Sequence, residues 1–236
     1  MDQIPADFVL VAGPLVGSSS WEPTAGQLRD RGQRVHVPDV LTACGTPPLW
    51  SQWTSHLINL IPHGNELILV GHSSASALVA DLASKLATRA LIIVDGDVPP
   101  AIGAAPPVRP ALRDFIAGLA GPDGALPLWS KWFRHDPPRA SLVGIDILAR
   151  DSVALSQFER ELPQMNISWF DDTIDLAGWD HVPSGYLQTS AIYDHAAAEA
   201  LRRGWPLRRL HGTHLHPTLQ PFETAAAILA ISRQLT

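Results

Sequence analysis

Residues 67–77 read Leu67-Ile68-Leu69-Val70-Gly71-His72-Ser73-Ser74-Ala75-Ser76-Ala77. Four consecutive apolar residues, without alternation, are typical of a strand that is covered on both faces. This strand enters a small-x-Ser-x-small turn and then an alanine-rich stretch that predicts a helix. Gly71 and Ala75 must be small because the turn is tight, and bulk on either side would collide with a neighbouring element. The sequence therefore predicts that Ser73 projects above a sheet at the start of a helix.

A serine in this position has two interpretations. It can cap the helix, or it can be a nucleophile activated by a base that an acid in turn orients. In the second interpretation, the backbone N–H of Ser74 lies at a helix N-terminus, where it can stabilise a developing oxyanion. Ala75 occupies a position where this pattern often has glycine.

The same kind of apolar run recurs along the chain, each time bounded by Gly, Pro or Asp: 8–11, 35–37, 67–70, 91–94, 186–189 and 207–210. Helical stretches lie between these runs: 22–31, 49–61, 74–86, 194–203 and 222–234. Strand alternating with helix predicts an α/β fold with a mostly parallel, doubly wound sheet.

The alternation stops between residues 97 and 184. This segment is rich in proline, holds four of the eight tryptophans, and shows helical pieces at 110–119 and 157–162 but no convincing strand. A long insert with its own apolar residues is typical of a lid. We therefore expect a core made of residues 1–97 and 184–236, with a helical lid inserted at 98–183.

Composition narrows the class of protein. Hydrophobic residues make up 46% of the 236, which is enough for a sizeable core. The net charge of -6, without a long run of either sign, argues against nucleic acid or a membrane as partner. Cys44 is the only cysteine, so no intrachain disulfide can form. The N-terminus lacks a basic, then apolar, signal pattern, and we expect a cytoplasmic protein.

Three histidines near the C-terminus are candidates for the base: His211, His214 and His216. They follow the last apolar run and precede the last predicted helix. The spacing of His214 and His216 also suits a metal ion, but no carboxylate or cysteine stands at metal-site spacing beside them. The sequence predicts neither a metal nor an organic cofactor.

With these motifs the chain resembles the α/β-hydrolase superfamily over nearly its whole length, and in particular its small esterase and hydroxynitrile-lyase-like branch. The last-loop pattern of that family falls on Thr213, His214 and Pro221, which implies that His214 is the base. The family acid follows the strand after the lid, and Asp194 is the first carboxylate there, although it also suits a helix N-cap. Asp95, after the preceding strand, is the rival acid, because some members place it there.

The oxyanion loop of the family falls on residues 9–21. Pro14 takes the position whose N–H normally faces the oxyanion, and proline has no N–H. The second donor is therefore expected from Leu15 or from a hydroxyl of residues 18–20, unless Ser74 is the one strong donor. Loss of one such donor typically costs about a hundredfold or more in rate.

The resemblance implies a serine hydrolase that cleaves an ester, thioester or lactone of a small, largely apolar substrate through an acyl-enzyme. The expected triad is Ser73, Asp194 and His214. The residues expected to line the substrate pocket are Pro14, His72, Trp129, Trp132 and Trp169. The same fold also hosts lyases, cyclases, cofactor-free reactions and catalytically idle ligand-binding relatives. A small molecule is the expected partner, and a homodimer is left open.

Overall fold

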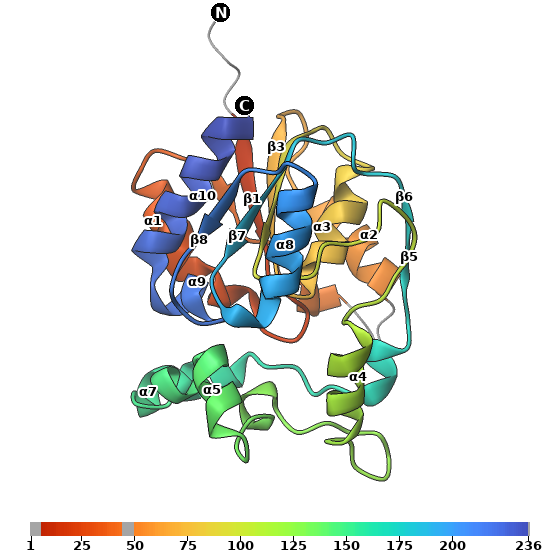
Figure 1. Cartoon of the computed structure of the whole chain (residues 1–236), viewed down its shortest axis with the longest axis vertical. Helices are drawn as coiled ribbons and strands as arrows, with labels where there is room; N and C mark the ends of the chain where they lie inside the picture. The colour runs from red at the N-terminus through yellow and green to blue at the C-terminus, as the bar shows by residue number, and fades with distance from the viewer. Residues whose placement is uncertain (1–5, 44–49, 236) are drawn as a thin grey trace, which may run out of the picture.

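A computed structural model describes residues 6–43 and 50–235, so Cys44 lies outside the described residues. Six strands form one sheet in the order β2-β1-β3-β4-β7-β8, and every neighbouring pair is parallel (Figure 1). The strands are β1 (Asp7–Val11), β2 (Val35–His36), β3 (Leu67–His72), β4 (Thr88–Val94), β7 (Ser184–Gln188) and β8 (Leu207–Arg209). Each overlaps a predicted apolar run, which confirms the predicted parallel sheet.

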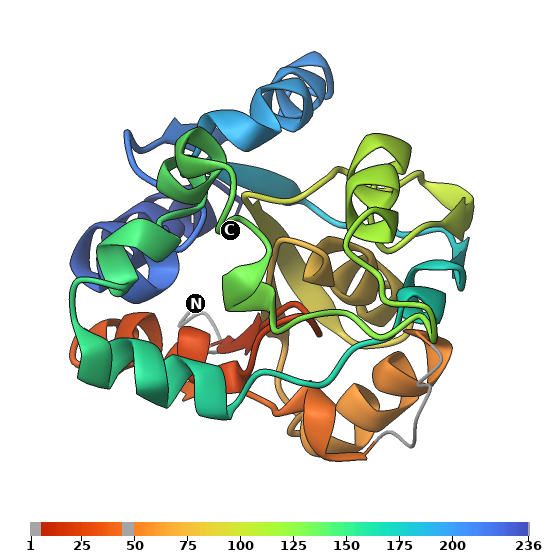
Figure 2. The ribbon, with the colours of Figure 1, turned by 90° about the horizontal axis from the view of Figure 1, so that it is seen from below.

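Helices cover both faces of this sheet (Figure 2). Helices α1 (Glu22–Arg29) and α10 (Pro221–Leu235) pack together on one face, and α2 (Trp50–Leu60) and α3 (Ala75–Ala83) lie on the other. Helix α8 (Asp194–Arg202) packs on β7 and β8. Short helical turns complete this part of the chain: η1 (Ser18–Ser20), η2 (Val40–Ala43), η5 (Ala191–Tyr193) and α9 (His216–Leu219).

The chain between β4 and β7 leaves the sheet, and its helices lie beyond the carboxyl ends of the strands, while its two short strands lie beside α3 (Figure 1). Its helices are α4 (Pro110–Ala117), η3 (Trp129–Lys131), α5 (Pro137–Val143), α6 (Ile145–Leu148), α7 (Ser152–Arg160) and η4 (Ile167–Phe170). The sequence indicates no convincing strand series in this segment, but two short strands form there: β5 (Ile102–Ala105) pairs antiparallel with β6 (Ile174–Ala177). In β6, Ile174 and Leu176 are buried and their neighbours are exposed, an alternation too short to stand out in the sequence.

The order of the strands determines where a site can form. From β1 the chain moves to one side to form β2 and then returns to the other side to form β3. In open α/β sheets, ligands bind outside the carboxyl ends of the strands at such a reversal. Ser73 follows directly after β3 at this point. Among residues 6–43 and 50–235, no helix is both long and apolar enough to cross a membrane.

Candidate active site

Ser73 stands in a strained turn between β3 and α3. Its φ angle is 59°, in the left-handed region that non-glycine residues rarely adopt. Gly71 permits the turn, because a Cβ atom at this position would lie 2.5 Å from Cγ2 of Val79 in α3. The Ser73 N–H donates to the carbonyl of Val94 at 3.0 Å, which fixes the turn to the neighbouring strand. The predicted strand–turn–helix context is therefore present.

His214 lies against Ser73, as predicted. Its Nε2 is 3.0 Å from the Ser73 Oγ. The loop that carries His214 follows β8 and is fixed at both peptide groups: the N–H donates to the Leu142 carbonyl at 3.0 Å, and the carbonyl accepts from Nε2 of His72 at 2.9 Å. The ring of Tyr193 stacks on the imidazole with 5.5 Å between centroids. The imidazole is thus held in one orientation.

The carboxylate against His214 belongs to Asp95. Its Oδ2 is 2.8 Å from Nδ1 of His214 and accepts the Ser190 hydroxyl at 2.6 Å. Its Oδ1 accepts the backbone N–H groups of Thr189 and Ser190, each at 2.9 Å. Burial opposes the charge of this carboxylate, but these hydrogen bonds and the nearby His214 outweigh burial and hold the Asp95 pKa below its usual value.

The prediction that Asp194 is the acid is wrong. Asp194 begins α8, and its Oδ1 accepts a hydrogen bond from Nε2 of Gln188 at 2.5 Å. The strand order explains the difference: β4 is the direct neighbour of β3, so Asp95 at the end of β4 reaches His214 beside Ser73. The end of β7 contributes Thr189 and Ser190, which hold Asp95 in place. The chain order nucleophile, acid, base is kept.

His72 holds the backbone of the base, His214, through a hydrogen bond to its carbonyl. It is buried, and burial together with the charge of His214 lowers the His72 pKa to about 3. The imidazole therefore stays neutral near neutral pH and donates its N–H to the His214 carbonyl. His72 reaches only a small recess beside Ser73 and lines neither larger cavity, so its predicted role in lining the substrate pocket is not supported.

The recess has a volume of about 10 Å³, close to that of one water-sized probe. Leu15 and Ser74, the predicted oxyanion donors, both line it, together with Ser73 and His214. Within the described residues, neither the Leu15 nor the Ser74 N–H donates to a backbone carbonyl. Among the serines of residues 18–20, the Ser20 hydroxyl is engaged with the Gly17 carbonyl at 2.8 Å. Pro14 does not line the recess or the cavities.

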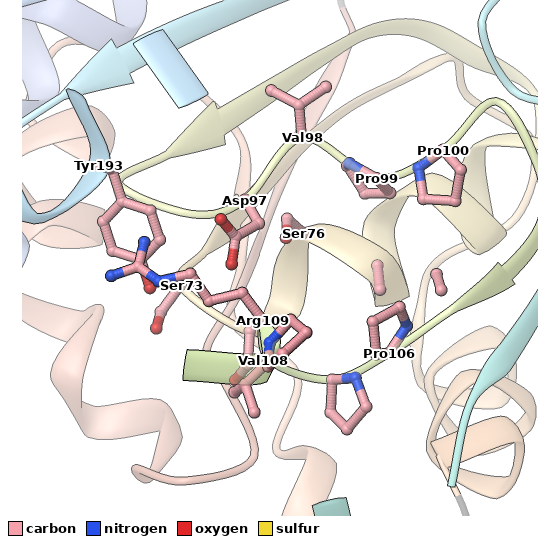
Figure 3. Close-up of a pocket in the computed structure, with 15 residues that line it drawn as sticks. Ser73, Ser76, Asp97, Val98, Pro99, Pro100, Pro106, Val108, Arg109 and Tyr193 are labelled. Atoms are coloured by element: carbon pink, nitrogen blue, oxygen red, sulfur yellow. The ribbon is translucent and has the colours of Figure 1, made fainter. Parts of the chain in front are cut away.

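Two cavities open beside Ser73. The larger has a volume of about 320 Å³ and is lined by Leu15, Ser73, Val108, Arg109, Ala111, Leu112, Phe115, Trp129, Trp132, Phe133, Arg139, Leu142, Val143, Ile192, Tyr193 and His214. The smaller, about 180 Å³, lies toward a proline-rich rim (Figure 3). It is lined by Ser73, Ser74, Ser76, Ala77, Asp97, Val98, Pro99, Pro100, Ala105, Pro106, Pro107, Val108, Arg109, Pro110 and Tyr193.

The tryptophans predicted to line the pocket divide into two groups. Trp129 and Trp132 line the larger cavity. Trp169 lines neither cavity, which corrects that part of the prediction. Its ring packs on Trp53 of α2 with 5.5 Å between centroids, and its carbonyl accepts the indole N–H of Trp50 at 2.5 Å. Trp169 therefore fastens the inserted segment to α2.

Tyr193 and Arg109 are two residues beside Ser73 that the sequence did not reveal. Burial, reinforced by the charge of Asp97, raises the pKa of the Tyr193 phenol, and a hydrogen bond with Ser73 opposes this rise only in part. Arg109 lies over the Tyr193 ring, with its Cζ 5.6 Å from the centroid (Figure 3). Neither residue belongs to a motif, so no local signal marked them. Within the described residues, no group of three or more metal-ligating side chains is placed to hold a metal ion.

Comparison with known proteins identifies the family of this chain. Residues 8–227 match the alpha/beta hydrolase family, and the chain belongs to this family. No curated protein matches the sequence. Tomato methylketone synthase I in complex with 2-tridecanone is 15% identical, with a TM-score of 0.75 over 99% of this chain and 100% of that one. A pyrethroid hydrolase is 19% identical, with a TM-score of 0.69 and 97% of each chain covered.

An extracellular α/β-hydrolase from a Paenibacillus species has a similar structure. It is 17% identical, with a TM-score of 0.70 over 96% of this chain and 99% of that one. At such low identities these likenesses show the fold alone.

Proposed function

We propose that this protein is a serine hydrolase that cleaves an ester, thioester or lactone of a small, largely apolar substrate. The observation that carries the proposal is the unbroken chain of hydrogen bonds from Ser73 through His214 to Asp95. Ser73, the first residue of this hydrogen-bond chain, also lines the larger, mostly apolar cavity, where a substrate can reach it. A nucleophile, a base and an orienting acid in this arrangement are the requirements for acyl transfer.

In the first half of the reaction, the Ser73 Oγ attacks the acyl carbon while its proton passes to Nε2 of His214. Asp95 accepts the hydrogen bond from Nδ1, fixes the tautomer and stabilises the imidazolium that forms. The oxyanion would lie in the small recess and accept from the N–H groups of Ser74 and Leu15. When the bond to the leaving group breaks, His214 gives its proton to the departing oxygen or sulfur.

In the second half, a water molecule loses a proton to His214 and attacks the acyl carbon of the acyl-enzyme. Collapse of this second intermediate releases the free acid and returns the proton to Ser73. The segment of residues 98–183 supplies Trp129, Trp132 and Phe133 to the larger cavity. We propose that it acts as the lid and that its aromatic side chains bind the apolar part of the substrate.

The test compares the wild-type protein with Ser73→Ala. A fluorophosphonate probe should label the wild type, and short-chain p-nitrophenyl esters should be hydrolysed. Both signals should vanish in the Ser73→Ala variant, while its melting temperature shows that it remains folded. Hydrolysis that persists in Ser73→Ala, or a wild type that no fluorophosphonate labels, would contradict the proposal.

A second candidate keeps the triad but not hydrolysis. Pro14 stands where the family usually supplies an oxyanion donor, and a structurally similar protein is a methylketone synthase. A lyase, a cyclase or a cofactor-free reaction would need less stabilisation of a tetrahedral intermediate. Labelling of Ser73 without turnover of any ester would favour this candidate. The cytoplasmic location and a homodimeric state stay predictions from the sequence.

A further inference from the structure

Arg109 places a positive charge at the junction of the two cavities. It precedes α4, and it lines both cavities together with Ser73 and Tyr193. Figure 3 shows these three residues around the smaller cavity. Its guanidinium lies over the Tyr193 ring, and its Nη1 donates to the Ile192 carbonyl at 3.3 Å. Ser73 and His214 line the larger cavity together with Arg109 and Tyr193. The charge of Arg109 therefore lies in the same cavity as the nucleophile.

This charge has no carboxylate partner within ion-pair distance in residues 6–43 and 50–235. The nearest ionisable group is His195, whose Nδ1 and Nε2 are 3.3 and 3.1 Å from Nη1 of Arg109. Nε2 of His195 is also 2.6 Å from Oδ1 of Asp97. Asp97 therefore pairs with His195 and not with Arg109. Nη1 of Arg109 is engaged by the Ile192 carbonyl and His195, and among the described residues Nη2 and Nε have no hydrogen-bond acceptor, so their N–H groups can bind another one.

The larger cavity favours an anion over a cation. Two arginines, Arg109 and Arg139, line it, and no carboxylate does. Arg139 is occupied, because its Nη1 lies 3.3 Å from Oδ2 of Asp136 and its Cζ lies 4.6 Å from the centroid of Phe115. Asp97 lines only the smaller cavity. An apolar cavity that holds an available guanidinium suits a ligand with an apolar body and one negative group.

We propose that the substrate is a carboxylate-bearing ester whose negative group pairs with Arg109 in the larger cavity. This inference rests on the proposed hydrolase function and names its substrate class. The apolar body would contact Trp129 and Phe133, and the ester carbonyl would face Ser73. A hydrogen bond to a charged group in such a place contributes about 10- to 100-fold to affinity.

Arg109 also ties the start of α4 to η5 through the Ile192 carbonyl, and this structural role needs a separate readout. If Arg109 only positions these elements, its loss slows charged and neutral substrates by the same factor. If it binds the substrate carboxylate, its loss slows only the charged ones. The ratio of kcat/KM for two isosteric substrates therefore separates the two roles.

The experiment uses two isosteric pairs, each a carboxylate and its primary amide. One pair is para-acetoxybenzoic acid and para-acetoxybenzamide, with the charge on the leaving group. The other is the p-nitrophenyl half-ester of octanedioic acid and its terminal amide, with the charge on the acyl group. Wild type, Arg109→Gln and Arg109→Lys are compared, with Arg150→Gln as the control because Arg150 is exposed and lines neither cavity.

We expect the wild type and Arg150→Gln to prefer the carboxylate of at least one pair by about tenfold or more in kcat/KM. Arg109→Gln should reduce this preference to near unity, and Arg109→Lys should retain part of it. The pair that responds identifies which side of the ester carries the charge. Ser73-dependent hydrolysis without a preference, or a preference that Arg109→Gln leaves intact, would overturn the inference and leave the hydrolase proposal standing.

Absence of Ser73-dependent hydrolysis with all four substrates would instead count against the hydrolase proposal. In that case, a binding measurement tests the anion site without any need for turnover. Calorimetry with the Ser73→Ala protein compares para-hydroxybenzoate with para-hydroxybenzamide. Tighter binding of the carboxylate that is lost in Ser73→Ala/Arg109→Gln supports the anion site, and equal binding of the two compounds overturns it.

Discussion

Gly96 lies directly against the backbone of Ser73. A Cβ atom at position 96 would lie 2.5 Å from the Ser73 carbonyl oxygen and 3.2 Å from its nitrogen. Ser73 and Asp95 both have positive φ angles, 59° and 44°, at the ends of the neighbouring strands β3 and β4. The two strained turns that carry the nucleophile and the acid therefore pack against each other. The residue between them must lack a side chain.

The first prediction concerns Gly96→Ala. The new methyl group would meet fixed backbone atoms, so the turn at Ser73 or the end of β4 must move. We expect ester hydrolysis to fall by about 100-fold, since a displacement of reacting groups by about 1 Å has that effect. The free energy of unfolding should fall by about 1–3 kcal/mol, as for overpacked cores. Ester assays and urea unfolding measure the two effects.

The control for this variant is Gly26→Ala. Gly26 lies inside α1, and a Cβ atom there would meet no atom within 4 Å. Alanine in an open helical position should leave activity unchanged and raise the free energy of unfolding by up to about 1 kcal/mol. Equal behaviour of the two variants would show that the contact between Gly96 and Ser73 is unimportant.

The second prediction compares Asp95→Asn with Asp194→Asn. An amide at position 95 cannot stabilise the imidazolium of His214 and disturbs the tautomer of its ring, so kcat should fall on the order of 10³- to 10⁴-fold. Asp194 touches Gln188 and lies outside the hydrogen-bond chain, so its amide variant should change kcat by less than about threefold. A larger loss in Asp194→Asn than in Asp95→Asn would reverse the assignment of the acid made from the structure.

The contrast between these two aspartates shows what the sequence could and could not predict. The strands and the serine turn are local features: a continuous apolar run fixes β3, and Gly71 and Ala75 mark the turn. The acid is not local, because Asp95 and Asp194 each follow a strand of the parallel sheet. Which of them meets His214 depends on the order of strands in space, and that order is absent from any single stretch of sequence.

The inserted segment is harder still to predict, because tertiary packing alone decides which of its residues line the cavity and which pack on the core. Trp129 and Trp169 have the same side chain and lie in the same segment, yet one lines the larger cavity and the other packs on Trp53. Arg109 enters the site only because α4 begins beside η5. Neither outcome follows from hydrophobic periodicity, which describes one element at a time.

The third prediction is that His72 makes the free energy of unfolding fall in mild acid. Its pKa is about 3 in the folded protein and about 6.5 in an unfolded chain, so below pH 6.5 the unfolded state binds a proton that the folded state does not. The contribution of His72 to the free energy of unfolding is fully present above pH 6.5. It is lost progressively as the pH falls toward 3, up to a few kcal/mol.

The variant His72→Gln tests this expectation, because glutamine cannot titrate but keeps an N–H donor for the His214 carbonyl. Urea unfolding at several values between pH 8 and pH 4.5 should show a weaker dependence on pH for His72→Gln than for the wild type. His135→Gln, at an exposed position, is the control and should follow the wild type. Part of the acid sensitivity should survive in His72→Gln, because the Asp95 pKa is also lowered by folding. Parallel curves for all three proteins would refute the buried, neutral state of His72.

The fourth prediction addresses the strain at Ser73. Ser73→Ala and Ser73→Gly both lose the hydrogen bond to His214, so the difference between them isolates the backbone. A Cβ atom at a φ of 59° costs about 1–2 kcal/mol, and the larger freedom of glycine in the unfolded chain offsets part of this. We expect Ser73→Gly to be more stable than Ser73→Ala by up to about 1 kcal/mol in urea unfolding.

The same two substitutions at Ser76 should give the opposite order of stability, with the glycine variant less stable than the alanine variant. Ser76 lies inside α3, where φ is helical and glycine is less stable than alanine by about 1 kcal/mol. If Ser73→Gly proved less stable than Ser73→Ala, as at Ser76, the turn would carry no strain. The position of the Ser73 hydroxyl would then have to come from side-chain packing. If glycine is the more stable variant at position 73 and the less stable one at position 76, the backbone at Ser73 is strained. The rest of the fold then holds Ser73 in this conformation, with its hydroxyl toward His214.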